Sequence, residues 1–193
     1  MSTLMSLKTQ TAPVDETQLA RQARADAEAF AELYRRHVTR VYRYHMAHIG
    51  NVKDAEDLTS QTFMAALEGI RSYRGSGSFA AWIMGIASRK RALFFRGSKP
   101  EVPLEAALHI PTPGLPTDKA AQQRLQMDQV RHALRQISPD RAEALALYYF
   151  GGLNAADTGR VLGKSEAAVK MLLSRGLRDL RERSSLALEV END

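Results

Sequence analysis

The amino-acid sequence predicts an all-α fold made of two small helical domains joined by a proline-rich linker. Apolar residues recur at helical spacing through most of the 193 residues, and no stretch alternates as a strand would. Five prolines fall within 98–117, and so many in a short span argue against a helix there. The predicted organisation is a flexible tail at 1–16, a first domain at 17–97, a linker at 98–117, a second domain at 118–186 and a tail at 187–193.

The first predicted domain has three main helices with recognisable ends. Asp26 and Ser78 precede two of them, and their side-chain oxygens can accept hydrogen bonds from the open amides of a first helical turn. Gly50 and Asn51 follow the first helix, and the stretch 72–78 contains two glycines and three serines, which predicts a loop. The predicted helices are Ala27–Ile49, 54–70 and 79–96, after a shorter helical pattern that begins at residue 17.

The second predicted domain ends in two helices joined by a tight turn. Asn154 can cap the first of these helices and Ser165 the second. Gly163 can end the first helix because glycine adopts the left-handed conformation without steric cost. The residues after 183 are expected to fray. Upstream, helix is expected to resume at 118, and Ser138 followed by a proline is typical of a helix start, which predicts a further helix over 139–150.

The last helix has an apolar face and an opposite face that is polar and mostly basic. Its apolar residues are Val169, Leu173, Gly176, Leu177 and Leu180. The opposite arc holds Lys170, Ser174, Arg175, Arg178 and Arg181. A short helix, a glycine turn and a longer basic helix form the pattern of a helix-turn-helix, which places its second helix in the major groove of DNA. An ordinary helical bundle with a solvated basic face also fits this segment taken alone.

The two ends of that helix suit different contacts with DNA. Base reading needs short polar or basic residues at the N-terminal end of the helix, where Lys164, Ser165, Glu166 and Lys170 lie. Arg175, Arg178 and Arg181 are better placed for phosphates, which set register without reading sequence.

The predicted helix 54–70 has an acidic stripe on one side. Its expected buried side consists of Thr59, Thr62, Phe63, Ala66, Leu67 and Ile70. Asp54, Asp57, Gln61 and Glu68 lie opposite, flanked by Leu58 and Met64. Such a face suits docking onto a basic partner helix. On pattern alone, an ordinary solvated face with acids near the helix N-terminus is the simpler interpretation.

A basic segment with interleaved aromatic residues closes the first domain. Five basic residues and no acid lie within 89–99, together with Phe94 and Phe95. Basic residues follow phosphates and aromatic rings can stack on unpaired bases. Trp82, by contrast, is expected to be a core residue more often than a base-stacking one.

Composition limits the function classes. Lysine and arginine total 27 against 22 acids, a formal net charge of +5, which mildly favours a polyanionic partner. The chain has no cysteine, which excludes disulfides and thiolate metal sites. No apolar run approaches the roughly 20 residues that cross a bilayer, and the N-terminus lacks the apolar core of an export signal. We therefore expect a cytoplasmic protein without membrane insertion.

Three segments together resemble a bacterial RNA polymerase sigma factor of the extracytoplasmic-function (ECF) group. They span residues 29–67, 72–96 and 138–182, in the order of the family, and the first contains the specific core AEDLTSQTF at Ala55 to Phe63. The resemblance implies that the first domain is sigma region 2 and the second is sigma region 4 with its helix-turn-helix. It also implies three kinds of partner: core RNA polymerase, promoter DNA and an anti-sigma factor that covers the polymerase-binding surfaces.

The resemblance carries roles over to particular residues. The acidic helix would dock on the clamp helices of the polymerase β′ subunit through Asp54, Asp57, Leu58, Gln61 and Met64. Region 2 would capture a flipped base of the −10 element and face the melted strand through Tyr73, Arg74, Ser76, Ser78, Trp82, Arg89, Lys90 and Arg91. Region 4 would bind the −35 element as duplex through Lys164, Ser165, Glu166, Lys170, Ser174, Arg175, Arg178 and Arg181, with its first helices near the β flap.

Three sites depart from the usual family residues, and they bear on the promoter sequence rather than on the class. Met171 and Leu172 stand where Ser-Arg is common, so one usual arginine contact is missing. Asp157-Thr158-Gly159 replaces Glu-Ile-Ala, and Ser88-Arg89 replaces Arg-Asn. A glycine inside a helix costs about 1 kcal/mol relative to alanine, so we expect the helix that contains Gly159 to be loosely held.

Three rival functions fit the sequence less well. A stand-alone helix-turn-helix regulator leaves the acidic helix and the serine-glycine loop without a role. An enzyme could use His45 and His48, three apart on a helix, as metal ligands, but no carboxylate at a matching spacing accompanies them. Surface positions are the simpler interpretation of the five histidines, which are His37, His45, His48, His109 and His132. A scaffold or anti-sigma-like protein would lack the paired basic surfaces. We expect no catalysis, no cofactor and no metal site.

Overall fold

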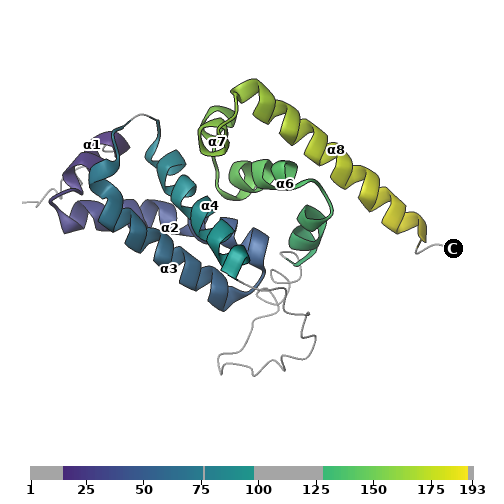
Figure 1. Ribbon diagram of the computed structural model, residues 1–193, viewed down its shortest axis with the longest axis horizontal. Coiled ribbons are helices and arrows are strands. Elements are labelled where there is room, and N and C mark those ends of the chain that lie inside the picture. The colour runs from purple at the N-terminus through teal and green to yellow at the C-terminus, as the bar shows by residue number, and fades with distance from the viewer. Residues whose placement is uncertain (1–14, 76, 98–127, 191–193) are drawn as a thin grey trace, which may run out of the picture.

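The computed structural model describes residues 15–75, 77–97 and 128–190, with side chains through residue 182, and all regular structure in these ranges is helical. Residues 1–14 of the predicted tail, the predicted linker and Ser76 lie outside these ranges. Figure 1 shows a first bundle, α1 to α4, beside a second group of helices that ends in the long α8. The all-α, two-domain expectation is confirmed.

The first domain folds as the capping residues predict. The Asp26 side chain accepts a hydrogen bond from the Glu28 amide at 2.9 Å, and Ser78 Oγ accepts one from the Ala81 amide at 3.0 Å. The next helix begins earlier than expected because Asn51 caps it by accepting from the Asp54 amide at 3.1 Å. The elements are α1 (Glu16–Gln22), α2 (Ala27–Ile49), α3 (Val52–Gly69), η1 (Ile70–Ser72) and α4 (Phe79–Gly97).

The second domain contains the predicted helix-turn-helix. Asn154 caps α7 by accepting from the Asp157 amide at 2.7 Å, and Ser165 Oγ accepts from the Ala168 amide at 3.2 Å. The single helix expected over 139–150 is divided, because the Gly151 amide bonds to the Ala146 carbonyl and widens the last turn. The elements are a helical stretch at 128–135, α6 (Pro139–Leu145), the π-helical turn η2 (Ala146–Phe150), α7 (Ala155–Leu162) and α8 (Glu166–Val190). Helix α8 therefore continues past residue 183, where fraying was expected.

Gly159 has a role that its helix propensity does not reveal. A methyl group built on it would lie 2.5 Å from the Lys164 carbonyl oxygen, and the Lys164 amide donates to the Gly159 carbonyl at 2.9 Å. The turn can fold back this closely only over a residue without a side chain. Gly163 completes the turn at a φ of 65°. The expectation of a loosely held helix is therefore not supported, because this glycine permits the close turn.

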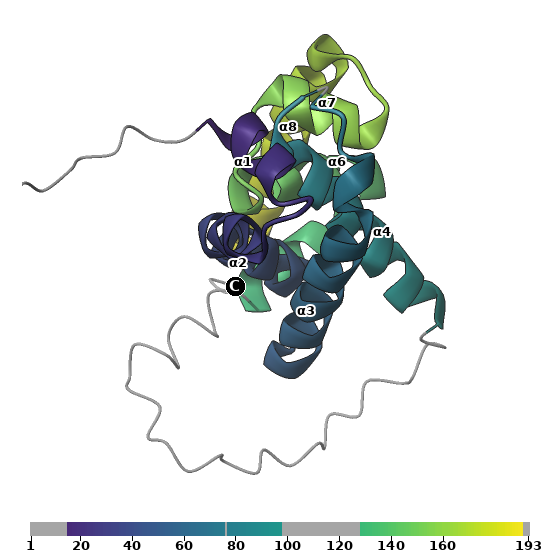
Figure 2. The ribbon, with the colours of Figure 1, turned by 90° about the vertical axis from the view of Figure 1, so that its left-hand side faces the viewer.

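The two domains are packed against each other and share their apolar cores. Leu147 and Leu153 of the second domain belong to the same buried cluster as Leu33 and Ile83 of the first. Conversely, Ala47 of α2 belongs to the buried cluster of the second domain. Figures 1 and 2 show η2 and α7 against the side of the bundle formed by α2 and α4, whereas α3 lies away from them. The interface is thus continuous with both cores.

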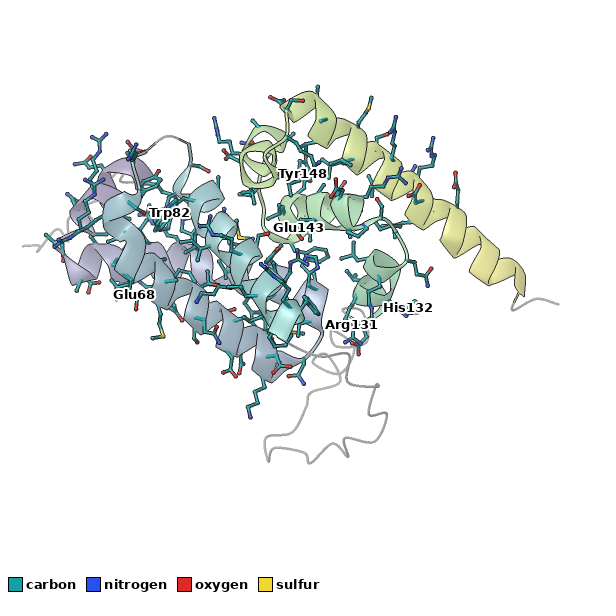
Figure 3. All side chains as sticks on the ribbon, viewed as in Figure 1. Glu68, Trp82, Arg131, His132, Glu143 and Tyr148 are labelled. Atoms are coloured by element: carbon teal, nitrogen blue, oxygen red, sulfur yellow. The ribbon has the colours of Figure 1, made fainter. Side chains whose placement is uncertain are left out.

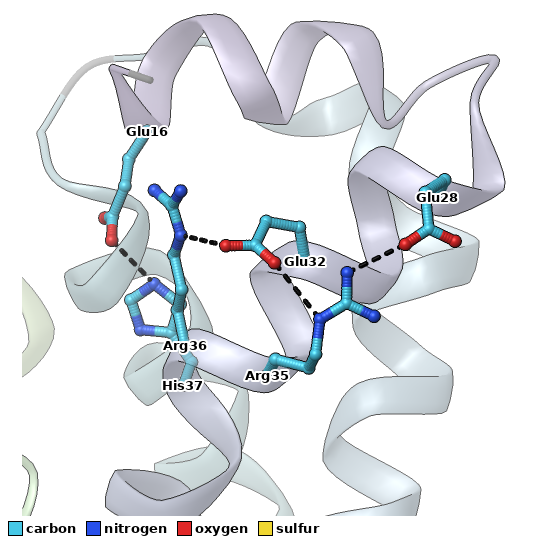
Figure 4. Close-up of polar contacts among 6 residues, drawn as sticks. All are labelled: Glu16, Glu28, Glu32, Arg35, Arg36 and His37. Atoms are coloured by element: carbon cyan, nitrogen blue, oxygen red, sulfur yellow. Dashed lines mark hydrogen bonds and ion pairs between the residues drawn. The ribbon is translucent and has the colours of Figure 1, made fainter. Parts of the chain in front are cut away.

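Two of the histidines expected at the surface are buried in the first domain. His37 and His45 are 1% and 0% exposed. His37 Nε2 lies 3.1 Å from a Glu16 carboxylate oxygen, next to the exposed ion pairs that line α2 (Figure 4). His45 Nε2 lies 3.2 Å from Thr62 Oγ1, and burial lowers its pKa to about 3. The surface interpretation of these two residues was wrong because each occupies the core side of α2.

Two features of the described residues bear on the function classes. Among the described residues, no helix is long and apolar enough to cross a membrane. Within the same ranges, no three His, Cys, Asp or Glu side chains gather as a metal ion would need.

Candidate nucleic-acid and protein interfaces

Helix α3 presents the predicted acidic stripe on its open face. Asp57, Gln61 and Met64 are exposed at spacings of four and three residues, and Met64 is 63% exposed. Asp54 is half-buried. Leu58, predicted to flank this stripe, is only 3% exposed because it packs into the core. Leu58 therefore packs beneath the acidic stripe, inside the domain, and is not part of the exposed face.

The apolar part of this face extends further than the sequence analysis predicted. Leu67, assigned to the buried side of α3, is 52% exposed, and Tyr34 of α2 is 43% exposed. The assignment of Leu67 was wrong. It lies three residues after Met64 on the same helical face, so a stricter phasing of the helix would have placed it there.

The loop between η1 and α4 is held by Tyr73. This residue is 3% exposed, packs against Phe79 and Trp82, and donates its hydroxyl hydrogen to the Gly77 carbonyl at 3.0 Å. Arg24, in the turn after α1, donates to the Tyr73 carbonyl at 2.6 Å. Burial raises the pKa of Tyr73. This tyrosine therefore supports the loop from inside and does not present its ring to solvent as a base-contacting residue would.

A cavity of about 330 Å³ opens beside the loop. Arg74 is exposed at its rim and Ser78 is half-buried. Trp82 is half-buried, not a full core residue, and Figure 3 shows it close to the loop. The cavity is lined by Ser72, Tyr73, Arg74, Ser78, Ala81, Trp82, Gly85, Ser88, Arg89, Arg160 and Val161. Two of these, Arg160 and Val161, come from α7 of the second domain.

The three basic residues on α4 do not share one surface. Arg89 is exposed, and with the half-buried Lys90 it lines a second cavity of about 310 Å³ that also contains Trp82 and Leu93. Arg91 points instead toward the second domain, where its Nη2 lies 3.0 Å from a Glu143 carboxylate oxygen. The prediction that all three face one strand does not hold in this arrangement, since successive residues of a helix point about 100° apart.

The eight residues predicted to contact duplex DNA are all exposed, in the turn before α8 and along that helix. Lys170 Nζ lies 2.7 Å from a Glu166 carboxylate oxygen, which raises the pKa of Lys170. Met171 is 55% exposed. The opposite face of α8 is anchored by the buried Val169 and Leu173. The structure therefore brings this whole set onto one continuous surface.

Comparison with known proteins identifies the chain. Its residues 33–99 match Sigma-70 region 2, and residues 127–180 match Sigma-70 region 4. The RNA polymerase sigma factor CarQ of Myxococcus xanthus is 30% identical over 84% of this chain and 94% of CarQ. The ECF sigma factor BldN of Streptomyces coelicolor is 34% identical over 84% of this chain and 63% of BldN.

The chain belongs to the ECF family of RNA polymerase sigma factors.

The extent of similarity differs among relatives of this sigma factor. This chain spans 63% of the length of BldN and 60% of the length of the ECF sigma factor SigE of Mycolicibacterium smegmatis. Its fold is similar to that of CnrH in complex with the cytosolic domain of CnrY, with a TM-score of 0.71 and 21% identity over 89% of this chain and 97% of that one. The sigma factor RpoE of Bartonella quintana, solved with the anti-sigma factor NepR, has a TM-score of 0.56 and 22% identity over 80% of this chain and 96% of that one.

Regions 2 and 4 of this sigma factor meet at Glu143, which the sequence analysis did not single out. Figure 3 shows Glu143 between the two groups of helices. Its Oε1 accepts hydrogen bonds from the Tyr44 hydroxyl at 2.6 Å and from Ser88 Oγ at 2.8 Å. Its Oε2 lies 3.0 Å from Arg91 Nη2 and 3.1 Å from His48 Nε2. We call these five residues the Glu143 cluster.

The Glu143 cluster keeps a charge in a nearly dry site. Glu143 is 7% exposed. Burial alone would raise its pKa, but His48, Arg91 and the Tyr44 hydroxyl outweigh burial and lower the pKa of Glu143 to about 2. Burial and the neighbouring carboxylate raise the pKa of Tyr44. The cluster is therefore an ionised carboxylate from region 4 held by donors from region 2.

Proposed function

We propose that this chain binds core RNA polymerase and directs it to specific promoters, with region 4 reading the −35 element as duplex and region 2 opening and capturing the −10 element. The observation that carries the proposal is the presence, in one chain, of a continuous exposed surface on α8 and a loop-bounded cavity with basic residues in region 2. The exposed acidic stripe on α3 supports attachment to a larger assembly. This role requires no catalysis by the chain itself.

Region 4 is suited to duplex DNA. The N-terminal end of α8 carries short polar and basic side chains that can reach base edges, and its basic residues further along can bind phosphates. Arg141 of α6 forms an ion pair with Asp179 of α8, so the helix is fixed to the body of the domain. A recognition helix that is exposed on one side and anchored on the other can enter a major groove without rearrangement.

Region 2 is suited to an unpaired strand. Unstacking a base costs a few kcal/mol, so opening DNA requires pockets for unpaired bases and basic cover for the strand. The cavity beside Ser78 and Trp82 has a volume of about 330 Å³, and Arg74 and Arg89 are exposed around it. We assign Arg74, Ser78, Trp82 and Arg89 to this contact, with Tyr73 as the internal support of the loop.

Helix α3 is suited to a basic partner helix. Asp57 and Gln61 are exposed, and Met64 and Leu67 add an apolar part to the same face. Charged residues around apolar anchors favour both fast encounter and specific docking. We assign this face to core polymerase, at the β′ clamp helices, and the first helices of region 4 to the β flap.

We further propose that an anti-sigma factor regulates this chain and that the chain acts in the cytoplasm with core polymerase. Support comes from the fold, which is shared with CnrH bound to CnrY and with RpoE bound to the anti-sigma factor NepR. The proposed domain limits remain 17–97 for region 2 and 118–186 for region 4.

Run-off transcription tests the function directly. Purified core polymerase would be supplied with a pool of genomic promoter fragments, with and without this chain. We expect new transcripts whose start sites share spaced −35 and −10 elements. Binding of duplex DNA without any binding to core polymerase would instead favour a stand-alone regulator.

A further inference from the structure

Helix α1 and the turn after it contact the loop between η1 and α4, which we call the −10 loop. Figure 1 shows α1 next to this loop. Arg24, in the turn, donates from Nη2 to the Tyr73 carbonyl at 2.6 Å. A methyl group built on Gly75 would lie 3.2 Å from Thr17 Cγ2, so α1 also touches the loop backbone. Helix α1 lies outside residues 33–99, which match Sigma-70 region 2, so that match does not account for these contacts.

The position of α1 is fixed at both of its ends. Its carboxyl-terminal part is anchored in the buried core cluster of region 2 through Leu19, Ala20 and Ala23. At its start, a Glu16 carboxylate oxygen lies 3.1 Å from Nε2 of the buried His37 in α2 (Figure 4). The Arg24 side chain therefore extends from a segment that is held against the rest of the domain.

Arg24 acts on the peptide group that joins Tyr73 to Arg74. The Tyr73 carbonyl and the Arg74 amide belong to one planar group, so a bond to the carbonyl fixes the direction in which the chain reaches Arg74. A hydrogen bond from a charged donor is stronger than one between neutral groups. Tyr73 is held a second time by its buried ring and by its hydroxyl, which donates to the Gly77 carbonyl at 3.0 Å. Arg24 thus determines how the backbone of Arg74, a candidate DNA contact, is oriented.

The −10 loop needs this support because of its glycines. Gly75 and Gly77 have φ values of 76° and 103°, which residues with side chains rarely adopt. A segment rich in glycine has many alternative conformations, so selecting one of them during binding costs free energy. A loop that is already held in its binding conformation avoids most of that cost.

We propose that α1 and the turn after it pre-shape the −10 loop for base capture, with Arg24 as a positioning residue that acts through the Tyr73 carbonyl. This inference rests on the proposed function, which gives the loop its role in capturing a base. The competing explanation is that Arg24, which is exposed, contacts a phosphate of the DNA strand directly. A positioning residue affects recognition of the captured base, whereas a phosphate contact strengthens binding of every strand equally.

Base capture can be measured with the complex of core polymerase and this chain. The probes are fluorescent single strands that span the −10 element of a promoter obtained by run-off transcription, either intact or with one base removed to leave an abasic sugar. For the parent, we expect one position at which removal of the base weakens binding most. For Arg24→Ala, we expect the ratio of intact to abasic affinity at that position to fall by about 10-fold, as for the loss of a hydrogen bond from a charged group. Binding of the abasic strand should be unchanged.

Two further variants control this test. Arg21→Ala removes an exposed arginine from the last turn of α1, and its affinity ratio should equal that of the parent. Arg24→Lys keeps a charged donor and should recover part of the ratio. Equal weakening of intact and abasic strands by Arg24→Ala, with a salt slope shallower by about 0.7, would show a phosphate contact and overturn the proposal. An unchanged ratio in Arg24→Ala would also overturn it.

The parent chain separates this inference from the proposed function. If the parent binds intact and abasic strands equally at every position, region 2 captures no base, and the proposed function of region 2 fails together with the inference. If only Arg24→Ala departs from the expected result, the inference alone fails.

A second measurement reports on the loop without DNA or polymerase. Trp82 is the only tryptophan in the sequence, and its ring centroid lies 5.5 Å from that of Tyr73. We expect Arg24→Ala to increase the quenching of Trp82 fluorescence by acrylamide, because a released loop exposes the indole, and Arg21→Ala to match the parent. Circular dichroism should show equal helix content in these variants. Equal quenching in Arg24→Ala and the parent would contradict the positioning role.

Discussion

Regions 2 and 4 present their candidate DNA contacts in different ways. Region 4 carries its whole set on α8 and the turn before it, all exposed. Region 2 assembles its set from a loop, helix α4 and a cavity, and there Tyr73 is buried and Arg91 is paired with region 4. A surface built on one helix can be predicted from periodicity. A surface built by packing depends on contacts between distant parts of the chain.

The largest expected effect concerns the exposed face of α3 in region 2, which is assigned to core polymerase and not to DNA. Asp57→Lys reverses a charge at the centre of the exposed stripe of α3, and like charges brought together at an interface cost several kcal/mol. We expect affinity for core polymerase to fall by about 100-fold, with an unchanged circular dichroism spectrum. Glu28→Lys on α2 is the control and should bind as the parent does. Equal binding by Asp57→Lys in a fluorescence titration would remove α3 from the interface.

Substitution by alanine should change the free energy of unfolding in opposite directions at two helical glycines, one in each region. A methyl group at Gly159 would collide with the Lys164 carbonyl at 2.5 Å, whereas one at Gly85 of α4 meets nothing within 4 Å. We expect Gly159→Ala to lower the free energy of unfolding by about 1–3 kcal/mol. Gly85→Ala should raise it by about 1 kcal/mol through helix propensity. Urea denaturation measures both, and a stabilised Gly159→Ala would show that the turn does not need the close approach.

The buried imidazole of His45 should make region 2 sensitive to acid. Its folded pKa of about 3 lies well below the pKa of about 6.5 of an unperturbed histidine, so between these values only the unfolded chain holds the proton. The free energy of unfolding therefore falls as the pH falls below about 6.5, by up to about 1.4 kcal/mol per pH unit from this residue.

Denaturation at pH 5 and pH 7 checks this dependence. The variant His45→Gln should lose that part of the slope, whereas His132→Gln, at an exposed position before α6, should keep the slope of the parent. An equal slope in the parent and in His45→Gln would contradict the assignment.

The sequence predicts the helices of both regions well and their mutual packing hardly at all. Caps such as Asp26 and Asn154 act locally, so sequence alone locates them. Leu67 could have been placed on the exposed face by its spacing from Met64, whereas the burial of Leu58 depends on what packs against α3. Glu143 lies in a helix whose pattern gives no sign of a partner, and its four contacts come from residues 44–91. Sequence alone predicts that Gly159 weakens its helix. Its close neighbour, the Lys164 carbonyl, comes into place only once the turn has folded, so sequence cannot show that the turn needs this glycine.

A smaller effect sharpens the assignment of phosphate contacts to region 4. Arg178→Ala removes one exposed cation from α8, so binding of promoter duplex should weaken for all sequences, and the slope of log affinity against log salt should become shallower by about 1. Arg35→Ala, which removes an exposed arginine of region 2, should leave the slope unaltered. A slope unchanged by Arg178→Ala would mean that this residue touches no phosphate.

The division of labour between the two regions can be measured on a single promoter obtained by run-off transcription. Permanganate oxidises unpaired thymines, so it reports which part of the DNA is open in the complex with core polymerase and this chain. We expect reactive thymines in the −10 element and protected, unreactive duplex at the −35 element. A −10 element that stays unreactive in a complex that otherwise initiates transcription, or an opened −35 element, would contradict this division of labour.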